Sequence, residues 1–335
     1  MDTPQTGHAR VVRPSLLLGA ALAILTALLS GCAQSSGTGT TPSASPSPTP
    51  ALTPTAAPGN PCGTTSTPPR RYQHVIWIIM ENKSYSSVIG SSSAPYETQL
   101  AHQCASDTHW SDAGSQYNSL PNYIAMTTGQ SGSILTPFTC DCAPSSLVSV
   151  TVDNIFRQVR TAGGTERSYA EGMNGNCSSS GATYAPKHNP ALYMWDSADR
   201  AACQHDDIPM GSATAGNFIN ALNNNTLPAY SLVAPNLCHD THDCGVPAGD
   251  QFLKTLLPKI LSSQTYHSGK TAVFVVWDED SYIPNIVIAP SVIPNTTSST
   301  AVNHYGLLRA TEEMLGLPLL GNAASATSLR TVFHI

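Results

Sequence analysis

Residues 74–80 form an unbroken apolar run, His74-Val-Ile-Trp-Ile-Ile-Met80, which stops abruptly at Glu81-Asn82. A run of this length predicts a strand that is buried on both faces, as in a parallel sheet. The carboxyl ends of such strands carry the ligand-binding groups of open α/β sheets. A carboxylate and an amide at that place could hold a hard cation through oxygen. The alternative is that Glu81 and Asn82 only begin a solvated loop.

Two further apolar runs, at residues 230–234 and 271–277, also end in polar clusters. Residues 235–243 contain Asn, His and Asp side chains, and residues 278–280 read Asp-Glu-Asp. If the three predicted strands lie side by side and parallel, their polar ends meet at one edge of the sheet. Only 11% of the residues are charged, so three acidic or His-bearing strand ends favour a functional site over chance.

The segments between these strands show helical periodicity, with apolar residues at i, i+3 and i+4. Helices are predicted at residues 123–127, 153–160, 249–261 and 305–315. Gly316 and Pro318 follow the last of them as stop signals. Residues 286–289 predict a fourth strand. Strands that alternate with helices predict an α/β fold with a doubly wound, mostly parallel sheet flanked by helices.

The amino-terminal sequence predicts export. Arg10 and Arg13 precede the apolar stretch 16–29, and this pattern indicates a signal peptide over residues 1–31. The stretch is too short for a confident membrane span. Cys32 follows Ser-Gly as in a bacterial lipobox, which implies cleavage before Cys32 and lipid attachment to its thiol. We therefore expect a cell-envelope lipoprotein anchored at the outer face of the membrane, with a secreted protein as the alternative.

Composition divides the remaining chain into two parts. Residues 32–61 are rich in Ser, Thr and Pro without an apolar period, which predicts a disordered tether. Residues 62–335 fit one large catalytic domain, since no second linker follows. The formal net charge is −6, and no cluster of Lys and Arg could follow a phosphate backbone. These features argue against nucleic acid as a partner.

Eight cysteines follow Cys32, and an even number in an exported protein predicts up to four disulfides. They are Cys62, Cys104, Cys140, Cys142, Cys177, Cys203, Cys238 and Cys244. The sequence leaves their pairing open, although the last two could close a small loop. Zinc binding by thiolates is the rival interpretation, but the Cys-x2-Cys pairs of a zinc ribbon are missing.

Ser119 begins the segment Ser-Leu-Pro-Asn-Tyr123, which predicts a helix start with Ser119 at the N-cap and Pro121 in the first turn. A serine at this place could instead be a nucleophile, because a helix N-terminus stabilises an anion and a nearby cation lowers the hydroxyl pKa. The spacing of Ser119 and Pro121 alone favours the helix-cap role for Ser119 over the nucleophile role. Neither a Gly-x-Ser-x-Gly elbow nor a Walker-type phosphate loop is present in the sequence.

Six segments occur in an order that resembles a known family. They are Val75–Tyr85, Ser119–Tyr123, Lys187–Pro190, Asn236–Cys244, Trp277–Glu279 and His304–Arg309. Together they resemble the phosphoesterase family of bacterial and fungal acid phosphatases and phosphocholine-type phospholipases C, within the alkaline-phosphatase-like superfamily. The resemblance covers about residues 72–317. It implies the three-layer fold of that superfamily and a metal-dependent phosphoric-ester hydrolase.

The resemblance also implies roles for single residues. Glu81 and Asn82 match the metal-binding pair of the family, and Asp278 and Glu279 match its remaining metal ligands. Ser119 matches the nucleophile, which also contacts the metal.

Further side chains match positions around the substrate. Asn122 matches an amide that holds a phosphoryl oxygen. Lys187, His239 and Asp240 are candidates for substrate binding. His188 and His242 are candidates for catalysis, although the resemblance leaves open which histidine binds phosphate and which protonates the leaving group.

Three departures refine the expected site. Asn236 with Asp240, and Asp278 with Glu279, replace the Asp/His pairs of two-zinc relatives, which favours one divalent ion (Ca, Mg, Mn or Zn). Tyr123 stands where sulfatases of the superfamily have Arg, which argues against a sulfatase. The segment after Asp278 lacks the long Gly-rich insertion of the larger phospholipases C, so a choline-lipid site loses its main support.

The resemblance therefore implies an acid-phosphatase-like phosphomonoesterase that acts through a phosphoserine at Ser119. A phosphodiesterase or phospholipase C using the same site is one alternative, and its substrate would be a phospholipid or another small phosphate ester. A tethered lipoprotein that binds phosphate ligands without turnover is the third hypothesis, and it leaves Ser119 and the acidic strand ends unexplained.

Overall fold

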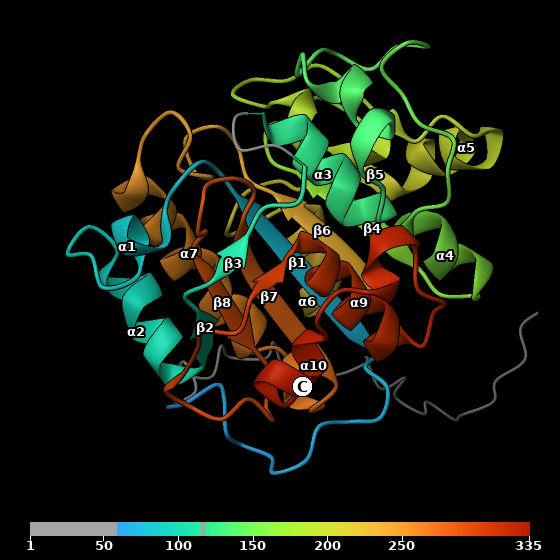
Figure 1. The fold of residues 1–335 in the computed structure, drawn as a ribbon. Coiled ribbons are helices and arrows are strands. Elements are labelled where there is room, and N and C mark those ends of the chain that lie inside the picture. Colours follow the sequence, from blue (N-terminus) through green and yellow to red (C-terminus); the bar gives the residue numbers. More distant parts are fainter. Residues whose placement is uncertain (1–58, 115–117) are drawn as a thin grey trace, which may run out of the picture. The chain divides into compact units, whose positions relative to one another are not determined.

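Eight strands form one mostly parallel sheet in the computed structural model, which describes residues 59–114 and 118–335 (Figure 1). In the order in which they neighbour one another these strands are β5 (Asp207–Pro209), β4 (Glu166–Ala170), β6 (Tyr230–Ala234), β1 (His74–Met80), β7 (Thr271–Trp277), β8 (Asn285–Ile288), β2 (Ala105–Asp107) and β9 (Thr296–Ser298). A separate two-stranded sheet pairs β3 (Trp110–Ser111) with β10 (Val302–Asn303). The predicted signal peptide, Cys32 and most of the predicted tether lie outside the described residues.

The three strands with polar ends are neighbours in the middle of the sheet. β1 pairs in parallel with β6 on one side and with β7 on the other. Met80, the last residue of β1, lies opposite Trp277, the last residue of β7. The residues of all three strands are buried except His74, as their apolar sequences predict. The expectation that their polar ends meet at one edge is therefore confirmed.

The fourth predicted strand is present one residue earlier than expected, and it runs the other way. β8 is antiparallel to both β7 and β2. Only residues 278–284 connect β7 to β8, and so short a link cannot carry the crossover that a parallel pair needs. This link starts at the predicted metal ligands, so its length also shapes the site.

Helices cover both faces of the sheet. The α-helices are α1 (Tyr85–Val88), α2 (Pro95–Gln103), α3 (Ser119–Thr128), α4 (Ile155–Thr161), α5 (Ser197–Asp206), α6 (Asn217–Asn223), α7 (Val246–Leu261), α8 (Gln264–His267), α9 (His304–Leu315) and α10 (Leu329–Phe333). The 3-10 helices are η1 (Gly132–Ile134), η2 (Thr136–Phe138), η3 (Pro186–His188), η4 (Pro190–Tyr193) and η5 (Gly321–Ala324). α3, α4 and α9 contact one another in front of the sheet in Figure 1, and α6 and α7 contact each other behind it.

All four predicted helices are observed, with different starts. The helix expected from residue 123 begins at Ser119, and the helix expected from residue 249 begins at Val246. In both cases a Pro occupies the first turn, where its missing N–H costs no hydrogen bond. Apolar periodicity is weak in such first turns, so it begins late in both helices, whereas Ser119 and Pro121 predicted the start of α3 to within one residue.

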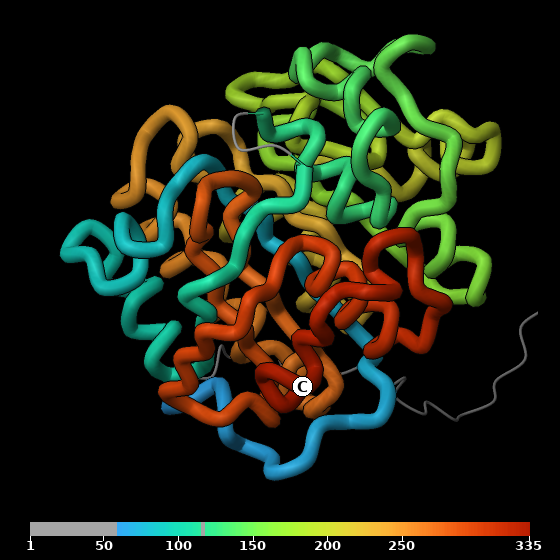
Figure 2. Tube along the Cα trace, in the orientation of Figure 1, coloured from blue at the N-terminus to red at the C-terminus, as the bar shows by residue number. Residues whose placement is uncertain are grey.

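The two ends of the described chain lie together. Figure 2 shows the blue segment before β1 beside the red carboxyl-terminal segment. Arg330 donates to the carbonyl oxygen of Pro69 at 3.0 Å, and His334 Nε2 lies 3.2 Å from that of Ser66. In the part of the chain that the structure describes, no helix combines the length and apolar character needed to cross a membrane.

Four disulfides pair the eight cysteines of the domain. They are Cys62–Cys104, Cys140–Cys142, Cys177–Cys203 and Cys238–Cys244. The expected number and the small loop between the last two cysteines are confirmed. Because every one of these thiols is in a disulfide, none is a zinc thiolate.

Candidate active site

Glu81 is the centre of the site. It directly follows β1 and is fully buried. Ser119 Oγ donates to Glu81 Oε2 at 3.0 Å, and the Tyr123 hydroxyl donates to Oε1 at 2.5 Å. Both donors lie on α3, one turn apart, so the first turn of α3 is fixed against the end of β1. The predicted metal ligand and the predicted nucleophile are thus in direct contact.

Asp278 and Glu279 follow β7 and lie beside the end of β1. The backbone N–H of Asn82 donates to Asp278 Oδ1 at 3.1 Å. Asn82 has φ 51°, a left-handed conformation that Asn tolerates well, while its side chain is exposed. His304, fully buried at the start of α9, donates from Nε2 to the Asp278 carbonyl oxygen at 2.6 Å. This edge of the site is therefore fixed by backbone contacts.

His188 lies between two carboxylates. Its Nε2 is 3.2 Å from Glu81 Oε2, and its Nδ1 is 3.2 Å from Asp240 Oδ2. The imidazole is fully buried and stacks on the Tyr123 ring, with centroids 5.5 Å apart and planes 9° apart. Burial, with the charge of Lys187 adding to it, holds the His188 pKa well below its usual value, so the neutral ring is favoured.

Lys187 brings positive charge to Ser119, the predicted nucleophile. Its Nζ lies 3.3 Å from Ser119 Oγ and 3.2 Å from Asp141 Oδ2. Burial lowers the pKa of Lys187, but the carboxylates of Asp141 and Glu81 more than offset this and raise it. The ammonium group therefore stays charged beside the hydroxyl.

Four buried carboxyl groups, Glu81, Asp240, Asp278 and Glu279, form what we call the acidic centre. Burial is the main cause that raises their pKa values: to about 7 for Asp240, about 6 for Asp278 and about 8 for Glu279, and well above the usual value for Glu81. The charge of Lys187 opposes the shift at Glu81, Asp240 and Glu279, and His242 also opposes it at Asp240. One ammonium group cannot balance all four of these groups in their charged form.

This shortage of positive charge fits a bound cation. Asp278 Oδ2 and Glu279 Oε2 are buried without a hydrogen-bond partner among the described residues. One possible ligand group is Glu81, His188 and Asp240, whose donor atoms lie within 4.8 Å of one another. Buried carboxylates that lie close together in proteins are commonly paired with a cation or coordinate a metal ion, which compensates their charge. A second group, Cys177, Cys203 and Asp207, is not available because its cysteines form a disulfide.

The remaining predicted residues lie farther from Ser119. His242 is about a third exposed, its Nδ1 is 2.7 Å from Asp243, and its ring centroid is 6.0 Å from that of His188. His239 instead contacts Glu171 at 2.7 Å, and that hydrogen bond raises its pKa. The substrate-binding role of His239 stays a prediction.

Asn122 has a structural contact that the sequence did not indicate. Its Oδ1 accepts the backbone N–H groups of Ala113 and Gly114 at 3.3 and 2.6 Å, and its Nδ2 donates to the Asn118 carbonyl oxygen. The amide thus fixes the loop before α3. Its predicted contact with a phosphoryl oxygen remains a prediction.

The predicted N-cap role of Ser119 is corrected. The cap position belongs to Asn118, and Ser119 is the first helical residue. Its hydroxyl donates to Glu81 rather than accepting a backbone N–H. The N–H of Leu120 donates instead to Asp141 Oδ1 at 3.0 Å. Sequence reasoning missed Asp141 because it lies 21 residues from the helix that it contacts.

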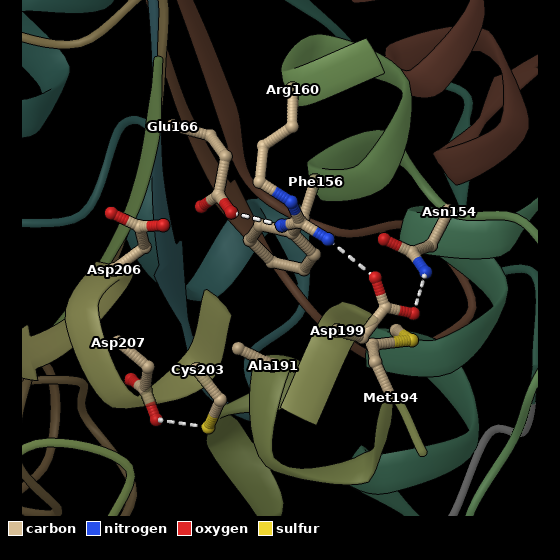
Figure 3. Close-up of a pocket in the computed structure, with 10 residues that line it drawn as sticks. All are labelled: Asn154, Phe156, Arg160, Glu166, Ala191, Met194, Asp199, Cys203, Asp206 and Asp207. Atoms are coloured by element: carbon tan, nitrogen blue, oxygen red, sulfur yellow. Dashed lines mark hydrogen bonds and ion pairs between the residues drawn. The ribbon is translucent and has the colours of Figure 1, made fainter. Parts of the chain in front are cut away.

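A small cavity away from the acidic centre is lined by charged side chains that are paired with one another. It is lined by ten residues that include Arg160, Glu166 and Asp199, and its volume of about 10 Å³ leaves room for no more than about one water (Figure 3). The arginine is paired with both carboxylates. An open groove of about 620 Å³ is lined by residues such as His109, Tyr282 and Asn303. The residues that line the cavity and the groove include neither Ser119 nor a member of the acidic centre.

Solved structures with a similar arrangement of sheet and helices include a member of the alkaline phosphatase superfamily. A member from Vibrio parahaemolyticus aligns with a TM-score of 0.53 and 14% identity, over 79% of this chain and 72% of that one. The lipoteichoic acid synthase LtaP of Listeria monocytogenes aligns with a TM-score of 0.52 and 10% identity, over 77% and 76% of the two chains. The predicted alkaline-phosphatase-like fold is confirmed.

The family follows from the sequence comparison. Residues 93–282, more than half of the chain, match the Phosphoesterase family, and this protein belongs to it. The phosphatidylinositol-3-phosphatase of Mycobacterium tuberculosis is 28% identical over 78% of this chain and 83% of its own length. The "Probable acid phosphatase" of Kluyveromyces lactis is 27% identical over 73% of this chain, which spans 58% of that protein. The predicted class, a phosphoester hydrolase, is confirmed.

Proposed function

We propose that this protein hydrolyses phosphate monoesters through Ser119, with phosphoserine as the covalent intermediate. The environment of the Ser119 hydroxyl carries the proposal. Oγ lies 3.0 Å from a buried carboxylate and 3.3 Å from the Lys187 ammonium group. A serine that only capped a helix would face a backbone N–H. An acceptor for its proton on one side and a cation for its alkoxide on the other suit a nucleophile.

The side chains around Ser119 support this chemistry. Glu81 accepts the hydroxyl hydrogen bond, and Lys187 is placed to stabilise negative charge on the phosphoryl oxygens. We propose Glu81, Asp278, Glu279 and Ser119 as ligands of one divalent ion, with Asn82 fixing Asp278 through its N–H. When bound, such an ion supplies Lewis-acid stabilisation of the phosphoryl charge.

His242 is our candidate for the general acid. It lies next to His188 at the partly exposed side of the site, where a leaving group departs toward solvent. His188 is buried between two carboxylates and is better placed to orient Glu81 and Asp240. On this assignment His242→Asn slows an alkyl phosphate more than p-nitrophenyl phosphate, because p-nitrophenolate leaves as an anion without protonation. Equal slowing of both substrates contradicts it.

The comparison with relatives supports a monoester substrate. The two relatives above carry phosphatase names, and one of these names specifies a phosphoinositide. A small phosphate ester or a phospholipid headgroup phosphate would both present the dianion that Lys187 and a divalent ion attract. A diester has one negative charge fewer and would gain less from the same groups.

The decisive experiment compares wild type, Ser119→Ala and the control Ser133→Ala, whose residue is exposed beyond α3. With a divalent salt present, wild type and the control should release p-nitrophenol from p-nitrophenyl phosphate, faster than from the bis ester. Ser119→Ala should lower kcat by at least about 10³-fold without a change in Tm. An unaffected Ser119→Ala variant contradicts the nucleophile, and preference for the bis ester favours a phosphodiesterase. If neither substrate releases p-nitrophenol, the result favours a protein that binds phosphate ligands without turnover.

We further propose that the enzyme is a lipoprotein of the cell envelope, attached through Cys32. The support is the sequence Leu-Ser-Gly-Cys32 after an apolar stretch and basic residues. Expression with a radiolabelled fatty acid should label the wild type and leave Cys32→Ser unlabelled and released from membranes. Label on the serine variant contradicts the anchor.

A further inference from the structure

Asp141 connects two parts of the active site. It lies in the sequence Cys140-Asp-Cys142, in the segment between α3 and α4. Oδ1 accepts the N–H of Leu120 in the first turn of α3 at 3.0 Å, and Oδ2 lies 3.2 Å from Lys187 Nζ. The same Nζ lies 3.3 Å from Ser119 Oγ. One carboxylate therefore holds the helix that carries the serine and the ammonium group that faces it.

Lys187 needs such a partner because lysine has a flexible side chain with a compact charge. Other carboxylates of the site, Glu81 and Asp278, also attract it. Without Asp141, the ammonium group is free to turn from Ser119 toward those carboxylates or toward solvent. Asp141 makes one orientation preferred, with the Lys187 charge beside the hydroxyl.

The backbone of Asp141 is fixed from both sides. The residue has φ 51°, in the left-handed region, and the disulfide Cys140–Cys142 spans it. The Tyr193 hydroxyl donates to the Cys142 carbonyl oxygen at 2.9 Å, and the Tyr193 ring packs edge-on against buried Phe138. This short disulfide loop is thus anchored to the domain and presents the carboxylate in one direction.

We propose that Asp141 is a positioning residue that aims Lys187 at Ser119, and that the Cys140–Cys142 disulfide fixes it in that role. The proposal rests on the phosphatase function given above and adds a residue that is remote in sequence from every predicted site residue. It assigns the disulfide loop a part in turnover as well as in stability.

A double-mutant cycle tests the link between Asp141 and Lys187. Asn at position 141 keeps an oxygen for the Leu120 N–H and removes the charge. Asp141→Asn should lower kcat on p-nitrophenyl phosphate about tenfold, and Lys187→Ala about 100-fold. The double variant should match Lys187→Ala within about threefold, because Asp141 acts through the lysine. A loss near the product of the two single losses, about 1,000-fold, overturns the proposal, since Asp141 would then act without Lys187.

The role of the disulfide has its own control. The variant Cys140→Ser/Cys142→Ser should lower kcat about three- to tenfold, and this loss should vanish in the Lys187→Ala background. Cys62→Ser/Cys104→Ser removes a disulfide that joins the start of the domain to the end of α2. It should lower Tm while leaving kcat of the folded protein unchanged. An unchanged kcat in the Cys140→Ser/Cys142→Ser variant overturns the role of the disulfide.

A second measurement separates this proposal from the proposed function. Inorganic phosphate, with the divalent salt present, should raise Tm of the wild type, and Asp141→Asn should weaken phosphate binding several-fold only when Lys187 is present. If wild type binds phosphate but has no phosphatase activity, the proposed function fails. Phosphate binding by wild type and Asp141→Asn, each with Lys187 and with Lys187→Ala, then still tests the role of Asp141. If Asp141→Asn weakens phosphate binding equally in the Lys187→Ala background, the positioning role of Asp141 is overturned. A wild type that neither binds phosphate nor hydrolyses the ester overturns both.

Discussion

Two clusters of buried carboxylates in this domain differ in how their charge is balanced. In what we call the arginine cluster, Arg157 and Arg160 pair with Asp199. Arg160 also pairs with Glu166, and Figure 3 shows Arg160 between these two carboxylates. The Asn154 amide adds a hydrogen bond to Asp199 at 3.0 Å. Every charge there has a partner, and the adjoining cavity is too small for a substrate.

The acidic centre has the opposite balance. Its four carboxyl groups share the charge of Lys187, and three of their oxygens are buried without a hydrogen-bond partner among the described residues. Buried charge without a partner destabilises a fold by several kcal/mol per ion unless something compensates it. The arginine cluster is therefore balanced by its own side chains, whereas the acidic centre lacks the positive charge that a bound cation would supply.

Removal of divalent ions should give the largest effect. Chelation followed by dialysis should lower phosphatase activity by at least about 10³-fold, because the acidic centre then repels an anionic substrate. The arginine cluster needs no ion, so far-UV circular dichroism should be unchanged. Readdition of single divalent salts should restore activity and identify the metal. Full activity after chelation, with metal analysis showing no bound ion, would remove the distinction between the two clusters.

Glu81→Gln should have the next largest effect. Glutamine keeps the shape and one acceptor for Ser119 but removes the charge, so we expect kcat to fall about 10²- to 10³-fold. The metal-free variant should be at least as stable as the metal-free wild type, since a buried carboxylate is gone. Urea unfolding after chelation measures this. Wild-type activity together with a large loss of stability would assign Glu81 to the fold instead.

Asp199→Asn should show the reverse pattern. It leaves two arginines without their shared carboxylate, and their side chains are about a quarter exposed. We expect a loss of about 2 kcal/mol in the free energy of unfolding, less than for a fully buried pair. The kcat of the folded protein should stay within about twofold of wild type. A kcat loss comparable to that of Glu81→Gln would contradict the contrast between the clusters.

The pH dependence of stability should show a smaller effect of Glu279. Burial raises its pKa to about 8, so the folded state favours the neutral acid. In the metal-free protein its contribution to stability is complete below the pKa of the unfolded chain, about 4.3. That contribution is lost as pH rises through 8. Between pH 5 and 9 we expect wild type to lose on the order of 2 kcal/mol more than Glu279→Gln. Equal losses would contradict an uncompensated Glu279.

Much of this site was predictable because it depends on strand ends. Glu81 and Asp278 each follow an apolar run that only a buried central strand explains, and parallel neighbours bring such ends together. The start of α3 could be located near Ser119 from Pro121. Each of these inferences uses information within about ten residues of the chain.

Other contacts were not predictable because they join segments that are distant in sequence. Asp141 reaches Leu120 and Lys187 across 21 and 46 residues. The Tyr123 hydroxyl contacts Glu81, 42 residues away in the sequence. The family resemblance indicated only that Tyr123 stands where sulfatases have Arg. The resemblance made His239 a candidate for substrate binding, and nothing in the sequence indicated that its ring contacts Glu171, 68 residues away.

The three central strands and the polar residues that end them could be located from the sequence, because hydrophobic periodicity and turn residues act locally. The sequence by itself also determined the number of disulfides in the domain, through an even count of cysteines. The tertiary structure alone decided which of those polar groups share the acidic centre and which are paired elsewhere. It decided, too, that Ser119 faces Glu81 and Lys187 instead of its own helix. The physical reason is that burial and charge balance depend on neighbours in space, and the packing of α3 against the sheet edge is what chooses them.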